Sequence, residues 1–107
     1  MDQEIKRVVI KLGTGLLSAG KGEIRAERIS QICSGIDALK KEGVEVIIVS
    51  SGAVGLGMGK LGLEQRPSEM SLLRSCASIG QSELMHAWKT SLGNHGLLAA
   101  QILLTRE

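Results

Sequence analysis

The chain has 107 residues, enough for one domain at most, and its 13 basic and 11 acidic side chains give a net charge of +2. The charges are mixed and Trp88 is the only Phe, Tyr or Trp residue, which argues against the basic face or stacking platform of a nucleic-acid binder. Cys33 and Cys76 have no CxxC or His-rich company, and no run approaches the ~18 apolar residues of a membrane span. We therefore expect a cytoplasmic protein with reduced thiols and no metal site of its own.

The first third of the chain predicts a strand, a loop and a helix. Residues 7–12 (RVVIKL) are rich in β-branched side chains and end at a Gly-Thr-Gly loop, as a buried strand does. Residues 18–23 are small and polar, and we expect a flexible, exposed connection there. Between residues 27 and 41 the apolar side chains recur every three or four positions, which predicts an amphipathic helix that ends before Gly43.

The middle of the chain repeats this order. Residues 44–49 (VEVIIV) are almost continuously apolar, as strands of a parallel sheet are, and lead into residues 50–53 (SSGA) and a glycine-rich stretch. Helical spacing resumes after Pro67 and again over residues 79–92. A β-α-β-α order begins to emerge.

The last segment is a turn at residues 94–96 (NHG) and an apolar run at residues 97–104, which we expect to be a third strand. The resulting β-α-β-α-β order predicts an α/β fold with a mainly parallel sheet and right-handed crossovers. Three strands and about three helices leave much of such a sheet uncovered, so we expect the chain to be part of a larger domain.

Two loops could carry chemistry, because ligands of open parallel sheets bind at the carboxyl ends of the strands. Residues 11–15 (KLGTG) follow the first strand and residues 50–53 (SSGA) follow the second. Glycine lets backbone N–H groups approach an anion closely, and Lys11 adds a full positive charge. The pattern is typical of a phosphate site.

Two well-known phosphate motifs nearly match, and we reject both. Residues 15–21 read G-x-x-x-x-G-K, but Gly22 stands where a Ser or Thr would bind Mg²⁺. Residues 13–18 approach the dinucleotide fingerprint, but the second strand ends in Ser50 and Ser51, where that fold has an acidic residue.

Each candidate side chain also has an ordinary structural interpretation. Lys11 could be a solvated charge at a strand end, and Ser50 and Ser51 could be turn residues that cap a helix. His95 beside Gly96 is better explained as a turn residue than as a catalytic base.

Four segments together resemble the amino acid kinase family. They are residues 8–14 (VVIKLGT), 47–53 (IIVSSGA), 79–84 (IGQSEL) and 101–105 (QILLT), in this order over essentially the whole chain. The resemblance implies a three-layer αβα sandwich, of which residues 1–107 form the N-terminal part, with the remainder of the domain absent from this chain.

Within the family, the resemblance is greatest to the branch that transfers the γ-phosphoryl group of ATP, with Mg²⁺, to the side-chain carboxylate of L-glutamate at the start of proline synthesis. It implies that Lys11 is catalytic and contacts the ATP phosphates. The other residues that it places at the phosphates are Gly13 and Thr14. The residues that it places at glutamate are Ser51, Gly52 and Ala53.

Two alternatives stay open. The chain could belong to a related kinase for aspartate, acetylglutamate, carbamate or a phosphate monoester. It could instead be a short paralogue that acts as an assembly or binding module. For an enzyme, we expect a homo-oligomer, no contact with nucleic acid or membrane, and doubtful activity of the 107 residues alone.

Overall fold

The computed structural model describes residues 6–13 and 15–102 of the chain. Its centre is a pair of parallel strands, β1 (Arg7–Leu12) and β4 (Glu45–Ser50), which pair in register from Arg7 opposite Glu45 to Leu12 opposite Ser50. Both strands lie where the sequence predicts them. Helix α1 (Ala26–Lys41) lies between them in the chain, so the three elements form a β-α-β unit. The expected α/β class with a parallel sheet is confirmed.

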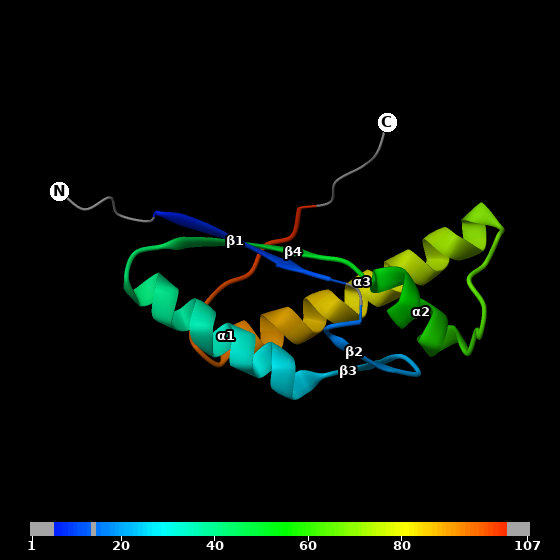
Figure 1. The fold of residues 1–107 in the computed structure, drawn as a ribbon, viewed down its shortest axis with the longest axis horizontal. Coiled ribbons are helices and arrows are strands. Elements are labelled where there is room, and N and C mark those ends of the chain that lie inside the picture. Colours follow the sequence, from blue (N-terminus) through cyan, green and yellow to red (C-terminus); the bar gives the residue numbers. More distant parts are fainter. Residues whose placement is uncertain (1–5, 14, 103–107) are drawn as a thin grey trace.

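The described helices cover one face of this sheet. In Figure 1, α1 and α3 (Met70–Gly93) lie on the same side of β1 and β4. The buried core between them contains one side chain of β1 and several of both helices: Leu12, Ile29, Cys33, Ile36, Leu84, Trp88 and Leu92. Strand β4 contributes the partly buried Val46 and Ile48, which pack against this core. The opposite face is open, with Val9 59% and Ile47 44% exposed. The described residues thus form two layers of the expected three.

The connection at residues 18–23, predicted to be flexible and exposed, is mostly exposed but has a regular structure that the sequence did not indicate. The segment forms a small antiparallel hairpin, β2 (Ser18–Gly20) with β3 (Glu23–Ile24). Gly22 is buried against the backbone of Gly59 and Lys60, where a side chain would not fit. One of the small residues that suggested flexibility, Gly22, is therefore needed for close packing, whereas Gly20 has open space beside it.

Helix α1 ends as the sequence predicts. Its buried side chains Ile29, Cys33 and Ile36 form one stripe, and the helix stops two residues before Gly43, whose N–H donates to the carbonyl of Lys40 at 3.0 Å. Asp37 on this helix accepts from Lys41 at 3.1 Å and lies 3.4 Å from His95 Nδ1 in the turn after α3. His95 is thus a turn residue, as its neighbour Gly96 suggested.

The glycine-rich stretch after residue 53 forms helix α2 (Ala53–Leu61), which packs along α3. A Cβ on Gly57 would overlap the carbonyl oxygen of Cys76, so the two helix backbones touch there. The two helical patterns seen after Pro67 are one continuous helix, α3, with buried residues every fourth position from Cys76 to Leu92. None of the described helices, not even the 24-residue α3, is apolar enough to span a membrane.

The predicted third strand is not formed over residues 97–102, and residues 103 and 104 lie outside the described part. Leu97 and Ala99 pack against the core, whereas Leu98 is fully exposed and Ile102 is 83% exposed. This alternation suits a strand, but a strand also requires a neighbour for its backbone hydrogen bonds. In the described structure β4 pairs with β1 and not with this segment.

Candidate functional site

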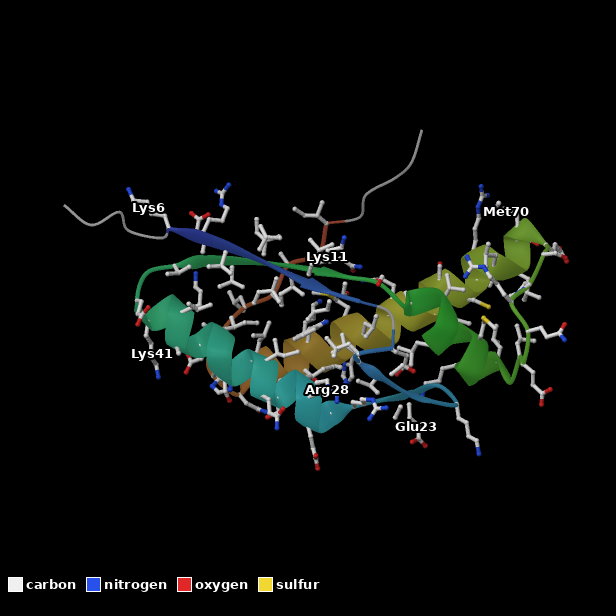
Figure 2. All side chains as sticks on the ribbon, in the orientation of Figure 1. Lys6, Lys11, Glu23, Arg28, Lys41 and Met70 are labelled. Atoms are coloured by element: carbon white, nitrogen blue, oxygen red, sulfur yellow. The ribbon has the colours of Figure 1, made fainter. Side chains whose placement is uncertain are left out.

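The two loops that the sequence singled out lie at the same edge of the sheet. Because β1 and β4 are parallel, their carboxyl ends meet, with Lys11 opposite Val49 and Leu12 opposite Ser50. Lys11 is exposed and belongs to the open face of the sheet, as do Val9 and Val49 (Figure 2). Its ammonium group is therefore available to an anion at this edge.

Ser51 connects the two loops directly. Its backbone N–H donates to the carbonyl oxygen of Leu12 at 3.3 Å, and its hydroxyl donates to the same oxygen at 3.4 Å. Ser51, which follows β4, is thus hydrogen-bonded to Leu12, which precedes the loop that begins at Gly13. The two predicted binding segments, far apart in the sequence, form one surface.

Gly52 and Ala53 begin helix α2. Gly52 has a φ of 97°, a left-handed conformation that favours glycine, and its carbonyl accepts the N–H of Leu56 at 3.1 Å. Its N-cap residue, Gly52, has no side chain that could cap the helix. The first N–H groups of α2 and the positive end of its helix dipole lie at the same sheet edge as Lys11.

The loop after β1 contributes glycine backbone to this edge. Gly13 has open space where a Cβ would be, and Gly15 has a left-handed φ of 85°. Thr14, predicted to bind phosphate, lies outside the described residues. A small hollow has lining residues from both loops, among them Gly15, Ser18, Ser51 and Gly52. The loop predicted to bind phosphate and the segment predicted to bind glutamate are therefore neighbours in the structure.

Helix α3 adds residues that the sequence did not assign to the site. Gly80 packs directly against the carbonyl of Ala53, and the next two residues, Gln81 and Ser82, line an open hollow of about 650 Å³ that begins at Ala53. The other lining residues of this hollow include Ser78, His86, Lys89 and Gln101, and none of its lining residues is acidic. The sequence showed Gln81 and Ser82 as part of a motif, but not that the motif adjoins Ala53.

The described residues offer no cluster of three or more His, Cys, Asp or Glu side chains that could hold a metal ion. The two cysteines are both free and fully buried. Burial raises the pKa of the Cys33 thiol, only partly offset by a hydrogen bond with Ser91, so this thiol is a core side chain and not a nucleophile.

Comparison with known proteins decides the family. The profile of the amino acid kinase family matches residues 6–107, which is nearly the whole chain. The chain belongs to the amino acid kinase family. This agrees with the α/β architecture and with the four motifs that first indicated the resemblance.

Among members of the amino acid kinase family, the chain is similar to proteins named glutamate 5-kinase. It is 45% identical to the one from Listeria welshimeri over 102 residues, which are 95% of this chain and 37% of the relative. It is 40% identical over 105 residues to the one from Pelobacter propionicus, and 46% identical over 102 residues to the one from Dehalococcoides mccartyi, covering 28% and 27% of those relatives and 98% and 95% of this chain. The chain thus spans between about a quarter and just over a third of the length of these relatives.

Proposed function

We propose that this chain is the phosphate-binding and glutamate-binding portion of a kinase that converts L-glutamate and ATP to glutamyl 5-phosphate and ADP. The observation that carries the proposal is the pair of loops at one sheet edge, tied together by the hydrogen bonds from Ser51 to the carbonyl of Leu12. The similarity to relatives named glutamate 5-kinase supports glutamate as the acceptor.

The chemistry of this transfer suits the residues present. A side-chain carboxylate is already ionised at neutral pH, so it can attack the γ-phosphorus without a general base. The new bond joins a carboxylate oxygen to phosphorus as the bond to the β-phosphate oxygen breaks and ADP leaves. Catalysis of such a step rests on positioning and on positive charge beside the phosphoryl oxygens.

In the proposed site, each segment has one role. Lys11 places its ammonium group at the transferring phosphoryl group and stabilises the charge that develops there. Gly13 and Thr14 bring backbone N–H groups to the phosphates. Ser51, Gly52 and Ala53 hold glutamate beside them, with the first turn of α2 favouring a negatively charged group. Mg²⁺ would arrive with the nucleotide phosphates.

The proposal can be tested in a chimera in which this chain replaces the corresponding residues of the Listeria welshimeri relative. We expect glutamate-dependent ADP release, measured in a coupled assay, and an acyl phosphate product that hydroxylamine traps as the hydroxamate. Turnover with aspartate, N-acetylglutamate or carbamate in preference to glutamate would support a different kinase of the family. No turnover with any of them, in a folded chimera, would support an assembly or binding module.

We also propose that the complete enzyme is a homo-oligomer in the cytoplasm, with no nucleic-acid partner for this portion. The exposed Val and Ile side chains on the open face of the β1–β4 sheet gain by burial, either under the third layer expected for the domain or against a second copy of the protein. Sedimentation velocity of the chimera measures its oligomeric state, and a monomer would contradict this part.

A further inference from the structure

The start of helix α1 holds the chain immediately after the proposed phosphate loop. Three consecutive carbonyl groups, those of Leu16, Leu17 and Ser18, each accept a hydrogen bond from it. Arg28 Nη1 donates to Leu16 at 2.8 Å, the backbone N–H of Arg25 to Leu17 at 2.7 Å, and Arg25 Nε to Ser18 at 3.0 Å. Figure 2 shows Arg28 in the first turns of α1.

Of these three hydrogen bonds, the one from the Arg28 side chain has the acceptor nearest in sequence to the glycine loop, the carbonyl of Leu16. Its guanidinium is partly buried and reaches across 12 positions in the chain to Leu16. The N–H of Leu16 in turn donates to the carbonyl of Gly13 at 3.3 Å, which closes a turn over the loop itself. Arg28 is thus linked to Gly13 through Leu16, whose carbonyl accepts from Arg28 and whose N–H donates to Gly13.

The hydrogen bond from Arg28 to the carbonyl of Leu16 also determines the orientation of the peptide group between Leu16 and Leu17. In a trans peptide the C=O of one residue and the N–H of the next point in opposite directions. With the Leu16 carbonyl held toward Arg28, the N–H of Leu17 is turned away from it, and the peptide cannot flip without losing a charge-assisted bond. A glycine-containing loop without such an anchor would have more conformations to lose when a nucleotide binds.

We propose that Arg28 is a positioning residue that fixes the phosphate loop of this chain for ATP. This role rests on the proposed function for the location of the phosphates. It makes no contact between Arg28 and the reacting atoms. It predicts that loss of the guanidinium weakens nucleotide binding and leaves glutamate binding at Ser51 nearly unchanged, because Ser51 is held separately by Leu12.

The test uses the chimera with Arg28→Met, which keeps an unbranched apolar stem but removes the donors. Binding of a non-hydrolysable ATP analogue is measured by calorimetry, and both KM values by the ADP-release assay. We expect the Kd of the analogue and the KM for ATP to rise roughly ten-fold, the size expected for one hydrogen bond from a charged donor. The KM for glutamate should stay within about two-fold. Arg28→Lys, which keeps the charge and one donor, should recover much of the loss, and Arg66→Met controls for removal of an exposed cation.

Three results would overturn the inference. They are an unchanged Kd, an equal rise in both KM values, and a lower melting temperature without weaker nucleotide binding. If Arg28→Met does not fold, Arg28→Gln is read by the same criteria. A chimera that binds the analogue in an Arg28-dependent way but does not phosphorylate glutamate would contradict the proposed function and leave this inference standing.

Discussion

Gly80 of α3 lies directly against the carbonyl oxygen of Ala53, the first residue of α2, so closely that a Cβ on Gly80 would overlap that oxygen. Ala53 belongs to the proposed glutamate segment, and a helix that starts 17 residues later in the chain therefore sets its position. The site depends on helix packing as much as on the two loops.

Replacing Gly80 with Ala should destabilise the protein. The added methyl group has no room, and overpacking of this kind typically costs about 1–3 kcal/mol. Thermal unfolding of the chimera measures the loss. Gly35 is the matched control, since it lies within α1 and has open space where a Cβ would be. Gly35→Ala should be neutral or stabilise by up to about 1 kcal/mol. Equal effects of the two substitutions would contradict the close contact.

Lys11 should act mainly in the transition state. In the chimera, Lys11→Met should lower kcat about 10²–10³-fold, with a much smaller effect on glutamate binding, because the charge is needed most as the phosphoryl group moves. Steady-state kinetics with both substrates measure this. Lys21→Met, in the exposed turn between β2 and β3, is the control for loss of a surface charge. A Lys11→Met variant that keeps half of the original kcat would contradict the catalytic role proposed for Lys11.

Ser51→Val should raise the KM for glutamate more than the KM for ATP. Valine adds a branched group at the proposed glutamate segment and removes the hydroxyl that donates to Leu12. Ser51→Thr, which keeps a hydroxyl, should be milder. A change in the KM for glutamate on substitution of Ser51 would also show that this chain contributes to glutamate binding in the chimera. Equal changes for the two substrates would mean that the glutamate site lies elsewhere.

The 107-residue chain alone should show no glutamate-dependent ATP turnover and should self-associate. Its sheet exposes Val9, Ile47 and Val49 on one face, and each uncovered side chain of this type forgoes roughly 1.5–3 kcal/mol of burial. Sedimentation velocity and the ADP-release assay test both parts. Ile47→Lys, on the open face, should reduce self-association. A compact monomer that phosphorylates glutamate would contradict both expectations.

Cys33 should resist alkylation in the folded protein. Burial raises its pKa, so the reactive thiolate is scarce at neutral pH, and the side chain is fully buried as well. The sign of the linkage follows: the folded state holds its proton to higher pH than the unfolded state, so this contribution to stability is present below the ordinary thiol pKa and is lost as the pH rises above it. Iodoacetamide labelling of a Cys76→Ala chimera, with and without denaturant, measures the protection, and fast labelling of the native protein would contradict it.

The sequence by itself determined the elements whose signals are local. Residues 7–12 and 44–49 are apolar β-branched runs, and the stripe over Ile29, Cys33 and Ile36 has helical spacing, so the strands and α1 could be predicted almost to the residue. The parallel order also followed, because a helix between two strands leads back to the same sheet edge. That placed the Lys11 and Ser51 loops side by side.

Only the tertiary structure decided the rest, because the deciding contacts join residues far apart in the chain. The glycines of α2 cost about 1 kcal/mol each in an isolated helix, but two of them allow close packing: Gly57 lies against the α3 backbone at Cys76, and Gly59 lies against Gly22 of the hairpin. The apolar run at residues 97–102 looked like a strand, but pairing depends on a neighbouring edge, which no local pattern encodes. In the sequence nothing distinguishes Arg28 from the other basic residues, and only the structure shows its hydrogen bond to the carbonyl of Leu16. Local sequence preferences determine which residues form a helix or a strand. Contacts between distant parts of the chain determine what the side chains and backbone groups of that element pack against and bind.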